Sequence, residues 1–378
     1  MKANALTALL LACSATPALA ETKPPITLGV GYTSDSFFNV DGGIKEGFRQ
    51  MGLLELTGDA DLSPVLVDGA SAHASLQWVH GRSLSGDLIG DAQVHSNIDA
   101  PDAVRLFEAW LELPVAAKGR IKAGLVDLNG DFDVQTVGAL FLNSSHGIGP
   151  DFSQSGLQGP SIFPITSGAV VAGWQEAGWS ARIGLFDAVA GRRGDPRRNA
   201  LRLPGATGLL AVAEADVKLT EGVELQVGGW QYSDKFDRIE LAADGATVRR
   251  RGNRGAYAQL EGRLGTVASQ PLDGWVRVGT AASHVNTIGL YTGGGLAFGP
   301  ENGRWGLALA RARLGNPARR AAAPAGADKH ETVIELTYAR AVAEWLTIQP
   351  DVQYVINPGW DPSLGNALVA GVRLNFAL

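Results

Sequence analysis

The sequence predicts an all-β fold, a transmembrane outer-membrane β-barrel of about 16 antiparallel strands with inward-folded loops. Three observations predict it. Apolar and polar side chains alternate along many segments, these segments are about ten residues long, and short and long connections alternate between them. Segments of about ten residues are long for strands of a soluble protein, but they match the length that crosses a bilayer at a tilt.

The final segment, residues 366–378, has the sequence NALVAGVRLNFAL and shows the alternation clearly. Apolar residues from Leu368 to Phe376 occupy one parity, whereas Arg373 and Asn375 occupy the other. Because successive side chains of a strand point to opposite faces, one face would be apolar and the other polar. A soluble β-sandwich also alternates, but strand length and the secretory leader described below favour a barrel with lipid outside and water inside.

Sixteen segments follow this pattern, and an even number is typical of bacterial outer-membrane barrels. Pro350 interrupts one of them, and since proline donates no ladder hydrogen bond, we expect a bulge or a local loss of pairing there. The expected strands are 26–33, 44–57, 72–81, 103–113, 119–128, 168–176, 179–187, 208–219, 222–233, 255–264, 274–283, 286–297, 304–314, 330–342, 344–356 and 366–378.

The connections between these strands alternate in length. Short turns such as 176–178 and 220–221 alternate with long segments, which are 82–102, 129–167, 188–207, 234–254 and 315–329. Outer-membrane barrels have short periplasmic turns and longer outer loops. Two connections depart from this rhythm, because the expected inner turn at 265–273 is long and the outer one near 284–285 is short. A strand is misplaced there, or the barrel is locally irregular.

Residues 1–20 have the pattern of a secretory signal peptide. A basic start at Lys2 precedes an apolar run and an A-x-A site that ends at Ala20. The alternative is a lipoprotein box around Cys13. We therefore expect export through the inner membrane, integral insertion in the bacterial outer membrane, and one β-barrel domain over 21–378. The formal net charge of −6 argues against nucleic acid as a partner.

Several stretches resemble the carbohydrate-selective porins of the OprB family. They are HGRSLSGDLIGDAQVHSNIDA (80–100), LFEAWLE (106–112), GLVDLNGDFDVQTVGALFLNSSHG (124–147), SIFPITSGA (161–169), GLFDA (184–188) and WLTIQPDVQYVINPGWDPSLGNALVAGVRL (345–374). The resemblance implies a 16-stranded barrel through which sugars, especially monosaccharides such as glucose, diffuse passively into the periplasm. One departure is the final residue, Leu378, where the family favours phenylalanine.

Selection in a barrel of this width requires loops folded into it. The longest connection, 129–167, combines turn-forming residues with apolar side chains such as Phe141 and Phe152, so we expect it to pack inside the lumen as the constriction. The second long connection that matches the family, 82–102, is expected to narrow the pore with it.

A sugar site needs planar or forked hydrogen-bond partners around the ring and an aromatic face beneath it. Strand parity places Trp110 and Trp230 in the lumen and Trp179 and Tyr338 toward lipid. The candidate substrate-binding residues are Arg82, Asn97, Glu108, Glu112, Asn143, Ser144, Arg182, Glu224, Trp230 and Arg373.

Arginine clusters at 191–202, 248–254 and 311–320 leave an anion- or carboxylate-selective porin as the alternative function. The same clusters predict contact with the phosphate groups of lipopolysaccharide. We also expect the barrel to contact outer-membrane lipid. The chain is expected to be a monomer or a homotrimer.

No cofactor is expected. Residues 127–131 have the D-x-N-x-D spacing of a calcium loop, but the required glycine and distal glutamate are missing, so the support for calcium is weak. Ser145 and His146 are adjacent and do not form a catalytic dyad by themselves, and no nucleophile elbow or phosphate loop occurs. We therefore expect no enzyme.

Overall fold

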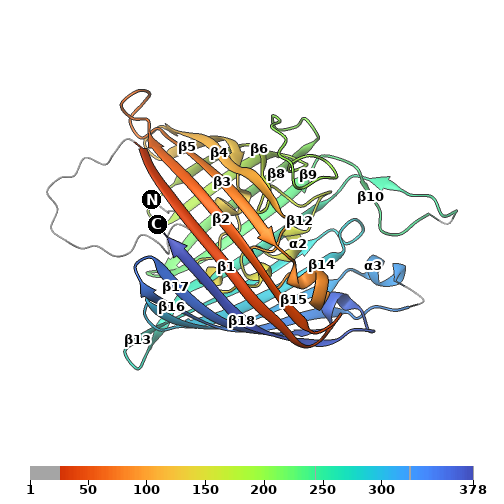
Figure 1. Ribbon diagram of the computed structural model, residues 1–378. Helices are drawn as coiled ribbons and strands as arrows, with labels where there is room; N and C mark the ends of the chain where they lie inside the picture. The colour runs from red at the N-terminus through yellow and green to blue at the C-terminus, as the bar shows by residue number, and fades with distance from the viewer. Residues whose placement is uncertain (1–25, 243, 323–324, 378) are drawn as a thin grey trace.

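The computed structural model describes residues 26–242, 244–322 and 325–377. Within them, sixteen antiparallel strands close a barrel, in which β1 pairs with β18 (Figure 1). The barrel strands are β1 (Ile26–Gly43), β2 (Gly47–Asp61), β3 (Ser71–Gly81), β4 (Ala103–Val115), β5 (Gly119–Val126), β6 (Ser167–Gln175), β7 (Trp179–Asp187), β8 (Leu209–Thr220), β9 (Val223–Tyr232), β12 (Arg254–Val267), β13 (Gln270–Ala281), β14 (Ile288–Phe298), β15 (Gly303–Leu314), β16 (His330–Ala343), β17 (Leu346–Ile356) and β18 (Gly365–Ala377).

The predicted fold class is confirmed, and each of the sixteen expected segments corresponds to one barrel strand. The expected signal peptide 1–20, with Cys13, and the final residue Leu378 lie outside the described residues. Among the described helices, none is long and apolar enough to cross a membrane.

The connections lie at two ends of the barrel, which we call the short-turn end and the long-loop end (Figure 1). Long connections 82–102, 127–166, 188–208, 233–253 and 315–329 share the long-loop end. The fourth of these contains a small hairpin, β10 (Phe236–Asp237) with β11 (Arg249–Arg250), and the last contains α3 (Asn316–Ala321).

Several strand boundaries differ from the prediction, and two regions illustrate this. β1 continues to Gly43, beyond the expected end at residue 33, and its polar residues Asp35 and Asn39 point into a polar lumen. The expected long turn 265–273 is wrong: β12 and β13 extend to a two-residue turn, in which Ala268 and Ser269 have φ of 48° and 63°. Two positive φ values are characteristic of the type I′ turn, whose twist matches the flanking strands.

Two strand irregularities have local causes. A β-bulge in β4 pairs Ser75 with Glu108 and Leu76 with Leu106, so that Phe107 is an extra residue. Uninterrupted alternation would place Phe107 on the opposite face from Glu108, toward lipid, but the bulge turns it inward, where it is buried with its ring 6.3 Å from that of Phe163. At Pro350, which faces outward, the β16–β17 pairing is interrupted, as expected from its missing donor.

The outward face of the barrel is apolar. Side chains such as Val104, Val276 and Leu307 are more than half exposed, with 60%, 55% and 53% of their surface accessible. Trp179 is also exposed, and Trp305 stacks on Tyr338 with 4.5 Å between ring centroids. An apolar band with aromatic residues near its edge is the surface that a barrel presents to lipid.

Candidate functional site

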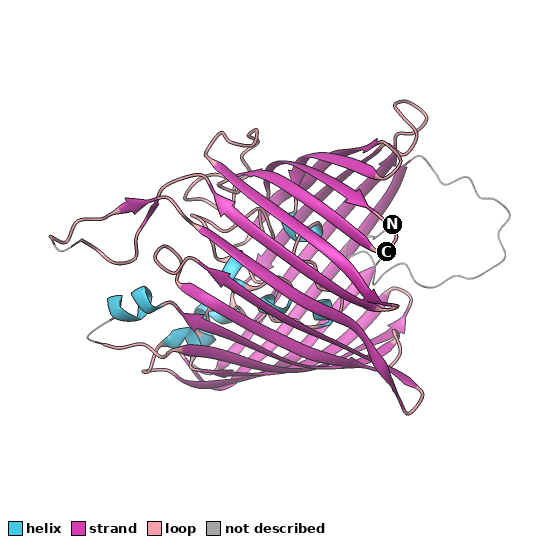
Figure 2. Cartoon of the chain, turned by 180° about the vertical axis from the view of Figure 1, so that it is seen from behind, coloured by secondary structure: helices cyan, strands magenta, loops and turns pink. Residues whose placement is uncertain are grey.

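The connection between β5 and β6, residues 127–166, lies inside the barrel. Figure 2 shows short helices within the outline of the strands, and Figure 1 labels α2 (Pro150–Ser153), which belongs to this connection. The α2 residue Phe152 is fully buried and stacks on Trp230 of β9, with 5.0 Å between ring centroids and 6° between ring planes. Burial of such aromatic surfaces stabilises the loop against the wall, since each ring removes a large apolar area from water.

Carboxylates of the barrel wall hold the backbone of this loop. Glu335 of β16 accepts the N–H groups of Leu142 and Asn143 at 2.6 and 3.0 Å. Glu261 of β12 accepts those of residues 136–137 at 2.9 and 3.0 Å. Loop backbone inside a protein needs partners for its polar groups, and an ionic acceptor gives stronger hydrogen bonds than a neutral one. The wall therefore fixes the loop at several separate points.

Arg277 of β13 forms the most buried ionic contact of the loop. Its guanidinium donates to both carboxylate oxygens of Asp133 at 2.8 and 2.7 Å and to Asp151 at 2.7 Å, and all three side chains are inaccessible to solvent. The backbone N–H of Asp133 donates to Glu214 of β8 at 2.7 Å. A Cβ at Gly149 would overlap the guanidinium, so this glycine leaves the space that Arg277 fills.

The connection between β3 and β4, residues 82–102, also folds inward, and we call it the second inward loop. Glu331 of β16 accepts the N–H groups of Ala92 and Gln93, both at 2.8 Å. The Ser96 hydroxyl donates to Asp35 of β1 at 2.6 Å, and Arg373 of β18 donates to the same carboxylate at 2.7 and 2.8 Å.

His95 in this second inward loop is buried, with its ring edge-on to Phe37 at 4.5 Å between centroids. Neither ring nitrogen has a hydrogen-bond partner among the described residues. Burial lowers the pKa of His95 from 6.5 to about 4, although the charge of Asp35 acts in the opposite direction. The unfolded chain therefore binds this proton at a higher pH than the folded protein does. Stability falls as the pH drops from about 6.5 toward 4.

Replacement of His95 by Phe should remove this loss of stability at low pH. Between pH 7.5 and 4.5, we expect the free energy of unfolding of the unaltered protein to fall by about 2–3 kcal/mol more than that of the variant. Urea titrations in detergent at the two pH values measure the difference, and His284→Phe, at a partly exposed site, is the control. Equal pH dependence of the unaltered protein and His95→Phe would contradict the prediction.

Four of the ten predicted site residues are buried and hold other parts of the structure. The Glu108 carboxylate accepts the N–H of Asp127 at 3.1 Å and the indole N–H of Trp110 at 3.0 Å. Asn143 donates from its side chain to Gln353 at 3.2 Å. Trp230 lies beneath Phe152, and Arg373 binds Asp35 as described above.

The other six retain accessible surface. Arg82 binds Asp87 at 2.8 Å with 71% of its side chain exposed, and Asn97 is exposed on the second inward loop. Three more face the lumen from the wall. Glu112 pairs with Arg120 at 3.1 Å, and Arg182 pairs with Asp216 and, at 3.0 Å, with Glu214. The third, Glu224 of β9, is half-buried. The sixth, Ser144, is half-buried and donates to the carbonyl of Ser96 at 3.2 Å. The inward loops meet close to Asn97, because its backbone N–H donates to the carbonyl of Leu142 at 2.8 Å.

Trp110 of β4 has a half-buried ring in the lumen, in agreement with its parity. His73 stacks on it at 5.2 Å between centroids, and the Lys122 ammonium lies 4.6 Å from its centroid. Lys122 also binds both oxygens of Asp131 at 2.9 Å. Parity could have shown that His73 and Lys122 face the lumen, but only the folded barrel brings them to one aromatic ring.

The sequence 127–133 does not gather its carboxylates at one point. Asp127 accepts the N–H of Asn129, Asp131 binds Lys122, and Asp133 binds Arg277. Among the described residues there is no group of three histidine, cysteine or acidic side chains able to hold a metal ion.

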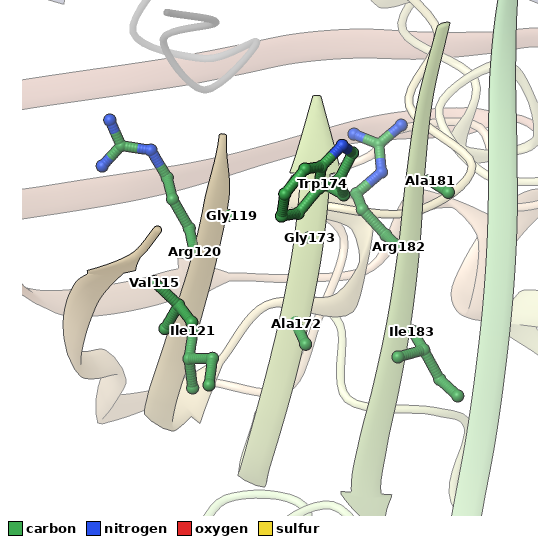
Figure 3. Close-up of a pocket in the computed structure, with 10 residues that line it drawn as sticks. All are labelled: Val115, Gly119, Arg120, Ile121, Ala172, Gly173, Trp174, Ala181, Arg182 and Ile183. Atoms are coloured by element: carbon green, nitrogen blue, oxygen red, sulfur yellow. The ribbon is translucent and has the colours of Figure 1, made fainter. Parts of the chain in front are cut away.

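A shallow hollow of about 390 Å³ lies at the short-turn end of β5, β6 and β7. Figure 3 shows Ile121, Ala172 and Ile183 side by side on these strands. Ile121, Trp174 and Ile183 belong to the exposed apolar face, so this hollow opens toward lipid.

Comparison with known proteins agrees with this geometry. The profile of the carbohydrate-selective porin OprB family matches residues 45–378. The chain belongs to this family. Family and fold together point to an outer-membrane transport channel for carbohydrates rather than to an enzyme.

Solved structures with the same fold include OprB of Pseudomonas putida. Its high-pH structure has a TM-score of 0.84 and 18% identity, with 94% of each chain covered. Its low-pH structure has a TM-score of 0.56 and 15% identity, over 94% of this chain and 93% of that chain. A mutant porin of Rhodopseudomonas blastica gives 0.56 and 13% identity, over 93% of this chain and all of the other. A comparison with curated protein sequences finds no significant match.

Proposed function

We propose that this porin lets monosaccharides such as glucose diffuse passively into the periplasm, and that its two inward loops select them. The constriction consists of residues 129–167 together with 82–102, and the long-loop end faces the outside of the cell. The observation that carries this proposal is the position of both loops inside the barrel, fixed by wall carboxylates.

The charges of the lumen support a neutral solute. Arg182, Arg277 and Arg373 of the wall each bind a carboxylate, and so do Arg120 and Lys122. A pore that concentrates anions needs cations with uncompensated charge, because paired charges cancel at short range. Paired arginines and carboxylates instead offer both donors and acceptors to hydroxyl groups. This pairing favours a sugar over the anion-selective alternative.

The residues divide into two roles. Arg82, Asn97, Glu112, Ser144, Arg182 and Glu224 have accessible surface and contact the sugar. Glu108, Asn143, Trp230 and Arg373 are positioning residues, because their polar atoms or rings already bind the loops. Trp110 provides the aromatic face for the C–H side of the sugar ring.

Liposomes with the purified protein test the function. They should swell in glucose, and millimolar glucose should reduce the single-channel current while phosphate leaves it unchanged. Current blocked by phosphate or carboxylates but not by glucose would establish the anion-selective alternative. Liposomes that remain impermeable to all of these solutes would disprove a channel.

Replacing Trp110 by Ala should weaken the block by glucose. An aromatic contact contributes about 1 kcal/mol, so the half-blocking concentration should rise about fivefold. The matched control is Trp179→Ala, which removes an indole from the lipid-facing side. Blocking curves in planar bilayers measure both. A half-blocking concentration that rises equally in the two variants, or in neither, would remove Trp110 from the sugar path.

A further inference from the structure

The strand β15 carries two arginines on the outward side of the barrel. Trp305, Leu307 and Leu309 are 50%, 53% and 43% exposed and alternate with buried glycine and alanine. Arg311 and Arg313 continue the exposed parity. They therefore point away from the lumen, at the long-loop end of an apolar wall.

Two further cations join them. The charges of Arg311, Arg313, Arg319 and Lys329 all act on the imidazole of His330. Arg313 lies directly opposite His330 in the β15–β16 pairing, and Arg319 comes from α3, which Figure 1 shows at the long-loop end. We call Arg311, Arg313, Arg319 and Lys329 the basic cluster.

No acidic side chain among the described residues pairs with the basic cluster. Within the part of the chain that the structure describes, none of its four side chains forms an ion pair or a hydrogen bond, unlike neighbouring Arg320, which binds Glu240 at 2.6 Å. Asp328, on the same connection, makes no ion pair, and Glu331 turns inward to the loop backbone. Like charges held together without a counter-ion repel one another, so an anion bound there would relieve the repulsion.

The height of the cluster on the wall indicates where this anion comes from. Arg313 follows Trp305 by eight positions, which is about 26 Å along a strand and about 20 Å along the axis of a barrel with strands tilted by roughly 40°. The apolar band of such a barrel is about 25 Å tall. The cluster thus lies at the rim of the band, directly above Leu307, Leu309, Ile334 and Leu336.

We propose that the basic cluster is a binding site for the phosphate groups of a phosphorylated membrane lipid in the leaflet at the long-loop end. Its acyl chains lie along the apolar side chains of β15 and β16, and guanidinium groups bind the phosphate oxygens by paired hydrogen bonds. A free phosphate ion would make no contact with the apolar wall next to the cluster. The site lies on the outside of the barrel and does not depend on which solute passes through it.

The test compares lipid binding by the double variant Arg311→Gln/Arg313→Gln with that of the unaltered protein. Native mass spectrometry in detergent is used, with lipid A as the phosphorylated probe and phosphatidylcholine and inorganic phosphate as further probes. The matched control is Arg340→Gln, since Arg340 is exposed on the outward parity of β16 at the short-turn end. Resistance of the folded barrel to unfolding in SDS at room temperature checks that each variant is folded.

We expect lipid A to bind the unaltered protein and Arg340→Gln equally and the double variant at least tenfold more weakly. Phosphatidylcholine and inorganic phosphate should show no such difference. Equal binding of lipid A by all three proteins would overturn the site. Inorganic phosphate that binds the cluster as tightly as lipid A does would overturn the lipid and leave a site for free anions. Loss of lipid A binding in Arg340→Gln as well would show charge-driven adhesion without a site.

Discussion

Replacing Arg277 by Gln should release the loop 127–166 from the wall and raise the single-channel conductance severalfold. The change leaves the carboxylates of Asp133 and Asp151 buried without their cation. Removal of one partner of a buried ion pair costs about 3–5 kcal/mol, because the remaining charge has lost its solvation. The loop can avoid this cost by moving its two aspartates into water.

Conductance in planar bilayers and limited proteolysis of residues 127–166 report this release. Arg263→Gln is the control, since Arg263 binds Asp273 within the β12–β13 hairpin and has 51% of its side chain exposed. The triple variant in which Asp133 and Asp151 also become Asn should recover much of the original conductance, because no unpaired charge stays buried. An Arg277→Gln channel with unchanged conductance and an uncleaved loop would show that the packing of Phe152 alone keeps the loop in place.

Replacing Asp35 by Ala should lower the stability of the whole barrel, by about 3–5 kcal/mol. Asp35 and Arg373 lie directly opposite each other in the pairing of β1 with β18, and Asp35 is also the acceptor of the Ser96 hydroxyl. The substitution leaves Arg373 buried without its carboxylate at the seam where the first and last strands meet. It also removes the acceptor of the Ser96 hydroxyl, and with it one of the hydrogen bonds that hold the second inward loop.

The temperature at which the barrel unfolds in detergent measures this effect. The exchange variant Asp35→Arg/Arg373→Asp should recover part of the loss, because it restores an ion pair in the same register. Asp59→Ala is the control: Asp59 lies in β2, has 59% of its side chain exposed and binds His73. If Asp59→Ala lowers the unfolding temperature as much as Asp35→Ala, the seam has no special role.

The barrel could be predicted from the sequence because each strand separates two different solvents. Lipid on one side and a polar lumen on the other force alternation at every second residue, as in residues 366–378. The prediction of strand bounds and side-chain orientation failed where apolar and polar side chains do not follow the contrast between lipid and lumen. Phe107 is apolar and still faces inward, since a bulge shifts the parity and a loop ring covers it. Asp35 is polar and still belongs to a strand, since Arg373 neutralises it.

The site was predictable only as a set of lumen-facing residues. Parity places Glu108 and Glu112 on the same face of β4, but the first accepts a loop N–H and the second faces Arg120 at the edge of the lumen. The difference depends on how far Asp127 lies from each carboxylate in space. Sequence spacing does not give that distance. It also does not show that Arg277 lies between two aspartates of a loop.

Glu214, Glu261, Arg277 and Glu335, which hold residues 127–166, come from β8, β12, β13 and β16, all of which follow that segment in the chain. The strands that precede the segment add Glu108 of β4 and Lys122 of β5. The segment therefore has its full set of partners only in the closed barrel, and the narrowing of the pore is a property of the whole wall and not of any local part of it.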